Sequence, residues 1–213
     1  KRVQAVHNYP ELSVFESIPS HPSLESGIYL VHHGRNITEH RGIFQYIELL
    51  KEVQKNHPKV KLILIGNMKK RCKLKFQELV QEYKIENDVI YTGPMKHRET
   101  IAYLKNTVEF IGVFLPKDVG QMALSVPVKT YEWVGLGIPQ LGATHVQNYT
   151  ENIVSGGAGL AAPHDDTQAQ ASAIEKIIAS YSAYSEQANT LAQQYCWEAE
   201  SKKLLDFYHR LWK

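Results

Sequence analysis

From Gly27 onward, short apolar runs typical of β-strands alternate with segments of helical periodicity. The first three runs each stop at a glycine, Gly34, Gly66 or Gly93, before a helical segment begins. This alternation is typical of βαβ units, in which parallel strands are covered by helices. The pattern predicts an α/β fold, a Rossmann-like parallel β-sheet flanked by helices on both faces. The expected strands are 28–33, 60–65, 88–92, 108–115, 138–142 and 159–162.

The segments between these strands place apolar residues at helical spacing, and prolines mark some of their boundaries. Ligands of open parallel sheets bind outside the carboxyl ends of the strands. We therefore expect the loops after the first four strands to share one crevice. Helices are expected over residues 43–56, near 76–83 and 101–104, from Pro127 onward, and over 167–182.

The two ends of the chain depart from this alternation. Residues 1–26 are rich in Pro and Ser toward their end and predict an extended interdomain linker, since proline fixes φ and restricts the residue before it. Residues 27–184 form the predicted Rossmann-like domain. Residues 185–213 are expected to be C-terminal helices packing toward an N-terminal domain that this chain lacks. Two interpretations of this aromatic tail stay open, packing on its own domain or crossing to a neighbouring one.

Composition excludes several classes of protein. A net charge of +2 over 213 residues is too small to indicate nucleic acid as a partner. No apolar run approaches the roughly 18 residues of a membrane span. The two cysteines, Cys72 and Cys196, have no metal or disulfide spacing, which favours a reducing compartment and predicts a cytoplasmic location. Peripheral attachment to the inner face of the membrane through the missing domain stays open.

A basic constellation follows the first expected strand. Gly34 and Arg35 stand at its end, and Arg41 precedes the next helix by two residues. Arginine donates bidentately to phosphate oxygens, and the positive end of a helix dipole adds to the attraction. The pair predicts a diphosphate site. From residue types alone, two solvated arginines on a polar loop are the competing interpretation.

A second constellation begins at Pro127, which predicts the start of a helix. The backbone N–H groups of Val128, Lys129 and Thr130 would then point into the crevice, with the Lys129 charge beside them. Glu132 lies one turn further on, and its carboxylate suits vicinal ribose hydroxyls. An ordinary first-turn glutamate that offsets the helix dipole is the alternative for Glu132.

Taken in order, the motifs resemble the C-terminal domain of family-4 retaining glycosyltransferases of the GT-B fold. The segment HNYPE is similar to the family's interdomain linker, and HHGRNITEHRGI to its glycine-arginine strand end. LILIGN is similar to its second strand, and VIYTGPMKHRETIAYLK to the loop beside the nucleotide base. VPVKTYEWVGLGIPQLGA resembles the segment with the ribose-binding glutamate, and FYHRLW the returning C-terminal helix. The resemblance runs through nearly the whole chain.

The resemblance implies roles for individual residues. Arg35, Arg41 and Lys129 would form the catalytic set around the donor diphosphate, with Arg41 standing where lysine is usual. Glu132 would bind ribose, and Leu124 stands where the family has a first glutamate that holds the donor sugar. The implied substrate contacts are Gly34, Arg35, Arg41, Thr92, Gly93, Pro94, Met95, Val128, Lys129, Thr130 and Glu132.

The implied activity is transfer of a sugar, of the hexosyl type, from a nucleotide-diphosphate sugar to an acceptor, with retention of configuration. UDP is the first choice of nucleotide and GDP the second, and the product is expected in cell-surface polysaccharide or glycolipid synthesis. The isolated domain is expected to be inactive, because acceptor contacts would come from the missing N-terminal domain. The alternatives are a GT-B-fold UDP-sugar epimerase and a catalytically inactive nucleotide-binding domain.

No metal or other cofactor is expected. His32 and His33 are neighbours in a strand and must point to opposite faces, so they do not form one compact metal site. His7, His97 and His145 have no ligand spacing. Basic residues and a helix N-terminus can stabilise a leaving diphosphate without a metal.

Overall fold

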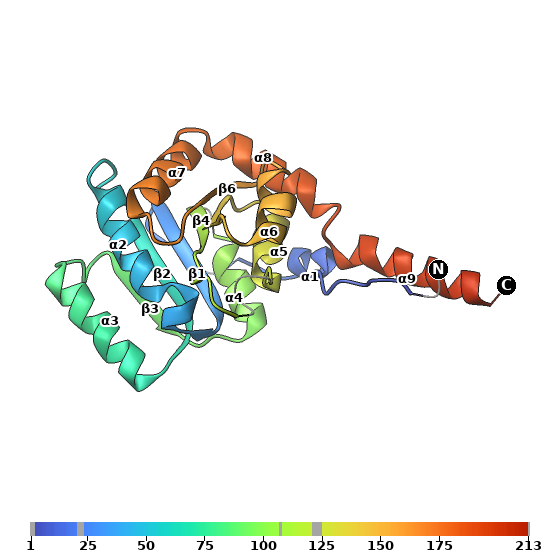
Figure 1. Ribbon diagram of the computed structural model, residues 1–213, viewed down its shortest axis with the longest axis horizontal. Helices are drawn as coiled ribbons and strands as arrows, with labels where there is room; N and C mark the ends of the chain where they lie inside the picture. The colour runs from blue at the N-terminus through green and yellow to red at the C-terminus, as the bar shows by residue number, and fades with distance from the viewer. Residues whose placement is uncertain (1–2, 21–23, 107, 121–124, 213) are drawn as a thin grey trace.

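The computed structural model describes residues 3–20, 24–106, 108–120 and 125–212, and its centre is a six-stranded sheet in the order β3-β2-β1-β4-β5-β6 (Figure 1). All five strand pairings are parallel. This is the strand order of the doubly wound Rossmann sheet. The strands are β1 (Ile28–Ile37), β2 (Lys61–Met68), β3 (Val89–Gly93), β4 (Glu109–Phe114), β5 (Gln140–Ala143) and β6 (Gly159–Ala162).

Helices cover both faces of this sheet, so the predicted fold class is confirmed. Helices α2, α3 and α7 lie on one side, and α4, α5 and α8 on the other (Figure 1). Because both faces are covered, the central strands are continuously apolar and buried, as residues 62–65 of β2 illustrate. The helices are α2 (Ile43–Gln54), α3 (Lys70–Glu82), α4 (His97–Leu104), α5 (Val128–Gly135), α6 (Gln147–Tyr149), α7 (Thr167–Ala179), α8 (Tyr181–Ala192) and α9 (Trp197–Leu211).

Strands β1 and β2 run past the glycines that were expected to end them, and one expected helix is divided in two. Strand β1 does not stop at Gly34 but runs to Ile37, with an irregular register between His33 and Asn36 that keeps it paired with β2. Strand β2 likewise continues past Gly66 to Met68. The helix expected over 167–182 is two helices, because the backbone at Ser180 is non-helical and α8 starts in a new direction.

The predicted linker contains a short helix, α1 (Leu12–Glu16), that sequence reasoning did not anticipate. Its Phe15 packs with Ile18 and with Ile101 of α4 in a small apolar cluster. The carboxylate of Glu198, on α9, accepts the backbone N–H groups of Leu12 and Ser13 at 3.2 and 2.9 Å. An anion at a helix N-terminus is favourable, so the C-terminal helix stabilises the N-terminal one.

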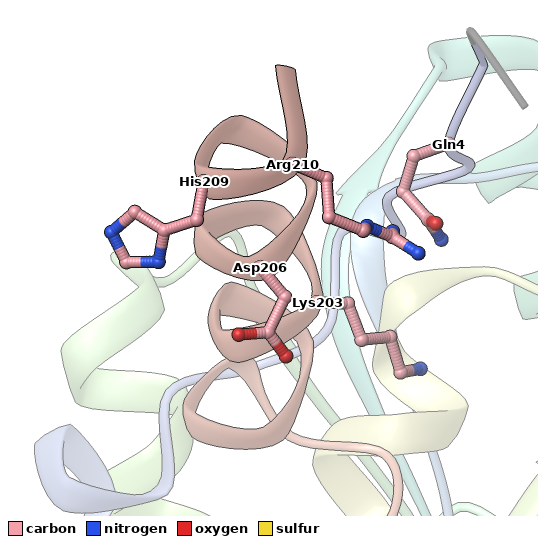
Figure 2. A pocket seen from close by; sticks show the side chains of 5 residues that line it. All are labelled: Gln4, Lys203, Asp206, His209 and Arg210. Atoms are coloured by element: carbon pink, nitrogen blue, oxygen red, sulfur yellow. The ribbon is translucent and has the colours of Figure 1, made fainter. Parts of the chain in front are cut away.

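Helix α9 projects from the body of the molecule beside the N-terminal segment (Figure 1). Several of its apolar side chains are in solvent, with Leu205 and Leu211 each 55% exposed. Figure 2 shows Arg210 extending toward Gln4, with Lys203 on the same side of α9, at a surface pocket of ≈ 560 Å³. In the described ranges, none of the helices combines the length and apolar character that crossing a bilayer requires.

The predicted boundary at residue 184 falls within α8, whose Ala188, Leu191 and Ala192 are buried. This helix packs on α5 of the Rossmann-like domain. The division into a linker, a domain and C-terminal helices stays a prediction.

Gly42 joins the first basic loop to α2 and gives a testable prediction of stability. Its φ is +85°, and a Cβ there would collide with the carbonyl oxygen of Leu115 at the end of β4. We expect Gly42→Ala to lower the free energy of unfolding by about 3 kcal/mol, the sum of backbone strain and a steric clash. Urea denaturation measures the change.

Gly120→Ala is the matched control. Gly120 also has a positive φ, +53°, but no atom of the described residues lies within 4 Å of a Cβ built there. Only the backbone cost of about 1 kcal/mol is expected. Equal losses in the two variants would contradict the packing argument for Gly42.

Candidate functional site

A crevice of ≈ 350 Å³ opens at the carboxyl ends of β1, β2 and β3, against the first turns of α4 and α5. It adjoins the boundary between β1 and β4, where the order of the strands reverses and Rossmann-like sheets bind their ligands. The crevice is lined by His33, Gly34, Arg35, Ile65, Gly66, Pro94, Met95, His97, Thr100, Lys129 and Glu132.

Glu132 is the acidic centre of the crevice. The residue is 8% exposed, and each carboxylate oxygen accepts one hydrogen bond, Oε2 from Nε2 of His33 at 2.7 Å and Oε1 from Nε2 of His97 at 2.8 Å. Burial alone would raise the pKa of Glu132, but these two hydrogen bonds and the electrostatic attraction of the two rings outweigh it and lower the pKa to about 2. Glu132 is therefore ionised although it is largely shielded from solvent.

The two histidines differ in their surroundings. His33 is buried in β1 and meets the ring of Trp133 edge to face at 5.3 Å, and burial lowers its pKa, so it is held neutral. His97 is the first residue of α4 and its side chain is 61% exposed. The bond to Glu132 raises the pKa of His97. A fixed neutral donor and a solvent-exposed donor thus share one carboxylate.

Lys129 forms the basic counterpart, buried in the first turn of α5. Its ammonium donates to Nε2 of His32 at 2.9 Å and lies 5.5 Å from the centroid of the Phe114 ring. Burial, and then the charge of Arg41, lower the pKa of Lys129 well below its ordinary value. In the described part of the chain no carboxylate forms an ion pair with it. The charged form of Lys129 therefore lacks a bonded anion.

His32 completes this arrangement on the other face of β1. Its Nδ1–H donates to the carbonyl of Val113 at 3.0 Å, and its ring lies 4.9 Å from that of Tyr46 in α2. Burial, and then the charge of Lys129, lower the pKa of His32 well below its ordinary value. As expected from strand alternation, His32 and His33 face opposite sides of the sheet.

Gly66 shapes the floor of the crevice. Its φ is +149°, and a Cβ there would collide with the carbonyl oxygen of Gly34 in the neighbouring strand. Glycine permits this close approach of β1 and β2, and no atom of the described residues lies within 4 Å of a Cβ placed on Gly34 itself. The backbone at the end of β1 is consequently accessible from the crevice.

Six of the residues expected in the site line this one crevice, and five do not. Arg41 is half-buried outside it, although its charge acts on Lys129. Thr130 is fully buried, and both its N–H and its hydroxyl donate to the Pro127 carbonyl, at 3.0 and 2.7 Å. Val128 lines an adjacent pocket of ≈ 420 Å³. Thr92 and Gly93, half-buried in β3, also lie outside the lining; the six inside are Gly34, Arg35, Pro94, Met95, Lys129 and Glu132.

Sequence reasoning missed five residues of the lining. His33 could have been found, because strand alternation places one of the two histidines on the face that α5 covers. His97 carries no such signal, since its contact with Glu132 depends on how α4 and α5 meet. The others are Ile65, Gly66 and Thr100. Leu124, where the family has an acidic residue, lies outside the described residues.

Within the described residues, no group of three or more His, Cys, Asp or Glu side chains is arranged to hold a metal ion. His145 and His164 do meet, with ring centroids 5.3 Å apart, but they belong to loops after β5 and β6. The expectation of a site without metal stays a prediction.

The sequence model of the family described as "Glycosyl transferases group 1" matches residues 15–194, most of the chain. The chain belongs to the group 1 glycosyl transferases. The match spans all six strands of this glycosyl transferase domain. It also includes every residue that lines the crevice. A search of curated protein sequences finds no match.

Solved structures share the fold at low sequence identity. Sucrose-phosphate synthase from Thermosynechococcus elongatus is 20% identical with a TM-score of 0.69, over 99% of this chain and 52% of that one. HepE of Anabaena, in complex with UDP and glucose, is 14% identical with a TM-score of 0.73, over 98% and 56%. The chain thus spans about half the length of these two proteins.

A third structure is itself a single domain. The C-terminal domain of the group 1 glycosyl transferase LpcC from Francisella tularensis is 15% identical with a TM-score of 0.63, and the match covers 87% of this chain and 92% of that one. The family match and these folds together identify the chain as a glycosyltransferase domain of the GT-B fold.

The ionised state of Glu132 gives this glycosyl transferase domain a predictable response to acid. Its pKa falls from an ordinary 4.5 to about 2 on folding, so its contribution to stability is complete above pH 4.5 and is lost as the pH falls toward 2. Over that interval we expect the free energy of unfolding of the unchanged chain to fall by on the order of 3 kcal/mol more than that of the Glu132→Gln variant. Urea denaturation across this pH range measures both.

Glu86→Gln, which removes an exposed carboxylate from a loop before β3, serves as the control. Its pH dependence should follow that of the unchanged chain. Parallel acid profiles for the unchanged chain and Glu132→Gln would disprove the assignment of the low pKa to Glu132.

Proposed function

We propose that this chain is the donor-binding domain of a family-4 retaining glycosyltransferase, which moves a hexose from a nucleotide-diphosphate sugar to an acceptor. UDP is the preferred nucleotide and GDP the second choice. The observation that carries the proposal is the pairing, across one small crevice, of an ionised buried carboxylate with a buried lysine that lacks a bonded anion. A nucleoside diphosphate supplies both missing partners, hydroxyl donors for Glu132 and an anion for Lys129.

The proposed pose follows from the position of each group. The ribose binds at Glu132, and the base lies against Pro94 and Met95 at the far wall of the crevice. The diphosphate lies between Arg35 and the N-terminus of α5, where Lys129 and the helix dipole attract negative charge. Charge that develops on the leaving diphosphate is stabilised by these groups and by Arg41. No metal is required by this arrangement.

In this proposal, the whole protein needs a second domain for sugar transfer. Acceptor contacts, and with them transfer itself, are assigned to an N-terminal domain, and the 213-residue chain alone is expected to be inactive. HepE, with UDP and glucose bound, is about twice as long as the part this chain matches, which supports the two-domain interpretation. We place the parent enzyme in the cytoplasm or at the inner face of the membrane, in polysaccharide or glycolipid synthesis.

Calorimetric titration of the chain with UDP and with GDP tests the proposal directly. UDP is expected to bind more tightly, and Arg35→Ala should weaken UDP binding about ten-fold or more, because a charge-assisted hydrogen bond to phosphate is lost. Lys59→Ala removes an exposed cation at the opposite end of the sheet and should leave the affinity unchanged. Absence of binding by both nucleotides at millimolar concentration would refute the donor site.

Lys129 gives a second test, because a bound diphosphate raises its lowered pKa and should make the protein take up a proton. The uptake is followed as a function of pH above the phosphate pKa of about 6, by comparing binding enthalpies in buffers of different ionisation enthalpy. Lys129→Met should abolish it, and uridine, which lacks the diphosphate, should cause none. Equal uptake with UDP and uridine would remove Lys129 from the diphosphate site.

A further inference from the structure

The hydrogen bonds to Glu132 leave a specific part of its carboxylate open. An ionised carboxylate has about four lone-pair positions, two on each oxygen. His33 occupies one position on Oε2 and His97 one on Oε1, at 2.7 and 2.8 Å. One lone pair of each oxygen is therefore left, on a side chain that lines the crevice. Two acceptors on one carboxylate match two hydroxyls on adjacent carbons.

The two histidines contribute unequally to this arrangement. His33 is locked by β1 on one side and by Trp133 on the other. Because Glu132 is ionised and can only accept, Nε2 of His33 must carry the proton. This single bond holds Oε2 only within the range of angles that a hydrogen bond tolerates, so the carboxylate can still turn part of the way about its last torsion, which has a broad energy profile. The second bond, from His97, removes that freedom.

His97 is placed for this task by its position at the start of α4 and by a contact with α1. It begins α4, directly after the loop that contains Pro94 and Met95. The centroid of the Phe15 ring in α1 lies 6.5 Å from that of the His97 ring, and most of the His97 side chain is exposed to solvent. Its polar contact in the crevice is Glu132, so its contribution there is orientation of the carboxylate.

We propose that His97 is a positioning residue that sets the Glu132 carboxylate to accept both vicinal hydroxyls of a ribose, and so makes the site selective for ribonucleotides over 2′-deoxyribonucleotides. This inference rests on the proposed function, since it assumes that the crevice takes the nucleoside of the donor. A site built to bond a hydroxyl rejects an analogue without it, because the acceptor is then left unpaired. The selectivity depends on His97 holding the Glu132 carboxylate so that each of its oxygens faces one of the two ribose hydroxyls.

The experiment compares UDP with 2′-deoxy-UDP in calorimetric titrations of the chain, using GDP and 2′-deoxy-GDP instead if only GDP binds. The unchanged chain is expected to prefer the ribonucleotide at least about ten-fold, the value of one hydrogen bond to a charged group. In His97→Ala the preference should fall to about two-fold, through weaker binding of the ribonucleotide. In His97→Gln it should return, because the glutamine amide can donate to the same oxygen without carrying a ring.

His40→Ala is the matched control, an exposed histidine between β1 and α2 that should leave both affinities unchanged. Thermal unfolding of each variant verifies that the fold is intact at the temperature of the titration, and His97→Ala should unfold at a somewhat lower temperature, because Glu132 loses one of its two hydrogen bonds. If the unchanged chain binds neither nucleotide pair, the proposed function fails and this inference with it. If it binds and selects ribonucleotides but His97→Ala selects equally well, the proposed function stands and the role of His97 is overturned.

Discussion

The carboxylate of Glu132 is the charge around which the crevice is built. An isolated carboxylate in so enclosed a position would take up a proton, because burial disfavours the charged form. Two histidine donors, one from β1 and one from α4, instead keep it ionised with a pKa of about 2. The relative placement of β1, α4 and α5 is thereby tied to one side chain. The fold and the site depend on the same three elements.

The same helix turn carries the opposite charge. Lys129 and Glu132 are three residues apart on α5, so one turn presents a cation and an anion toward neighbouring parts of the sheet edge. They do not form an ion pair with each other; Lys129 bonds to His32 and Glu132 to His33. Adjacent residues of β1, on opposite faces, keep the two charges apart. A lysine without a bonded anion beside a carboxylate with lone pairs still free is a suitable receptor for a ligand with phosphates at one end and hydroxyls at the other.

Most of the fold could be predicted from the sequence, because its signals are local. The apolar runs, the glycines after them and Pro127 fix where strands and helices lie to within a few residues. The irregular register after His33 could not be predicted, since it arises from pairing between strands. In the site, Arg35, Lys129 and Glu132 carry local signals and line the crevice. The partnership of His97 with Glu132 joins residues 35 positions apart and appears only once α4 and α5 are packed.

Hydrogen bonds and an apolar cluster join the two ends of the chain to each other and to α4. Glu198 of α9 binds the N-terminus of α1, the buried Glu200 accepts the N–H of His7 at 2.9 Å, and Phe15 of α1 packs on α4. The segment before the first strand, the last helix and the helix that begins at His97 are thus one packed unit. Separating the buried Glu200 from the His7 N–H is costly, because both partners would lose their hydrogen bond. Phe15 and Glu198 thus link both ends of the chain to α4, the helix that begins at His97.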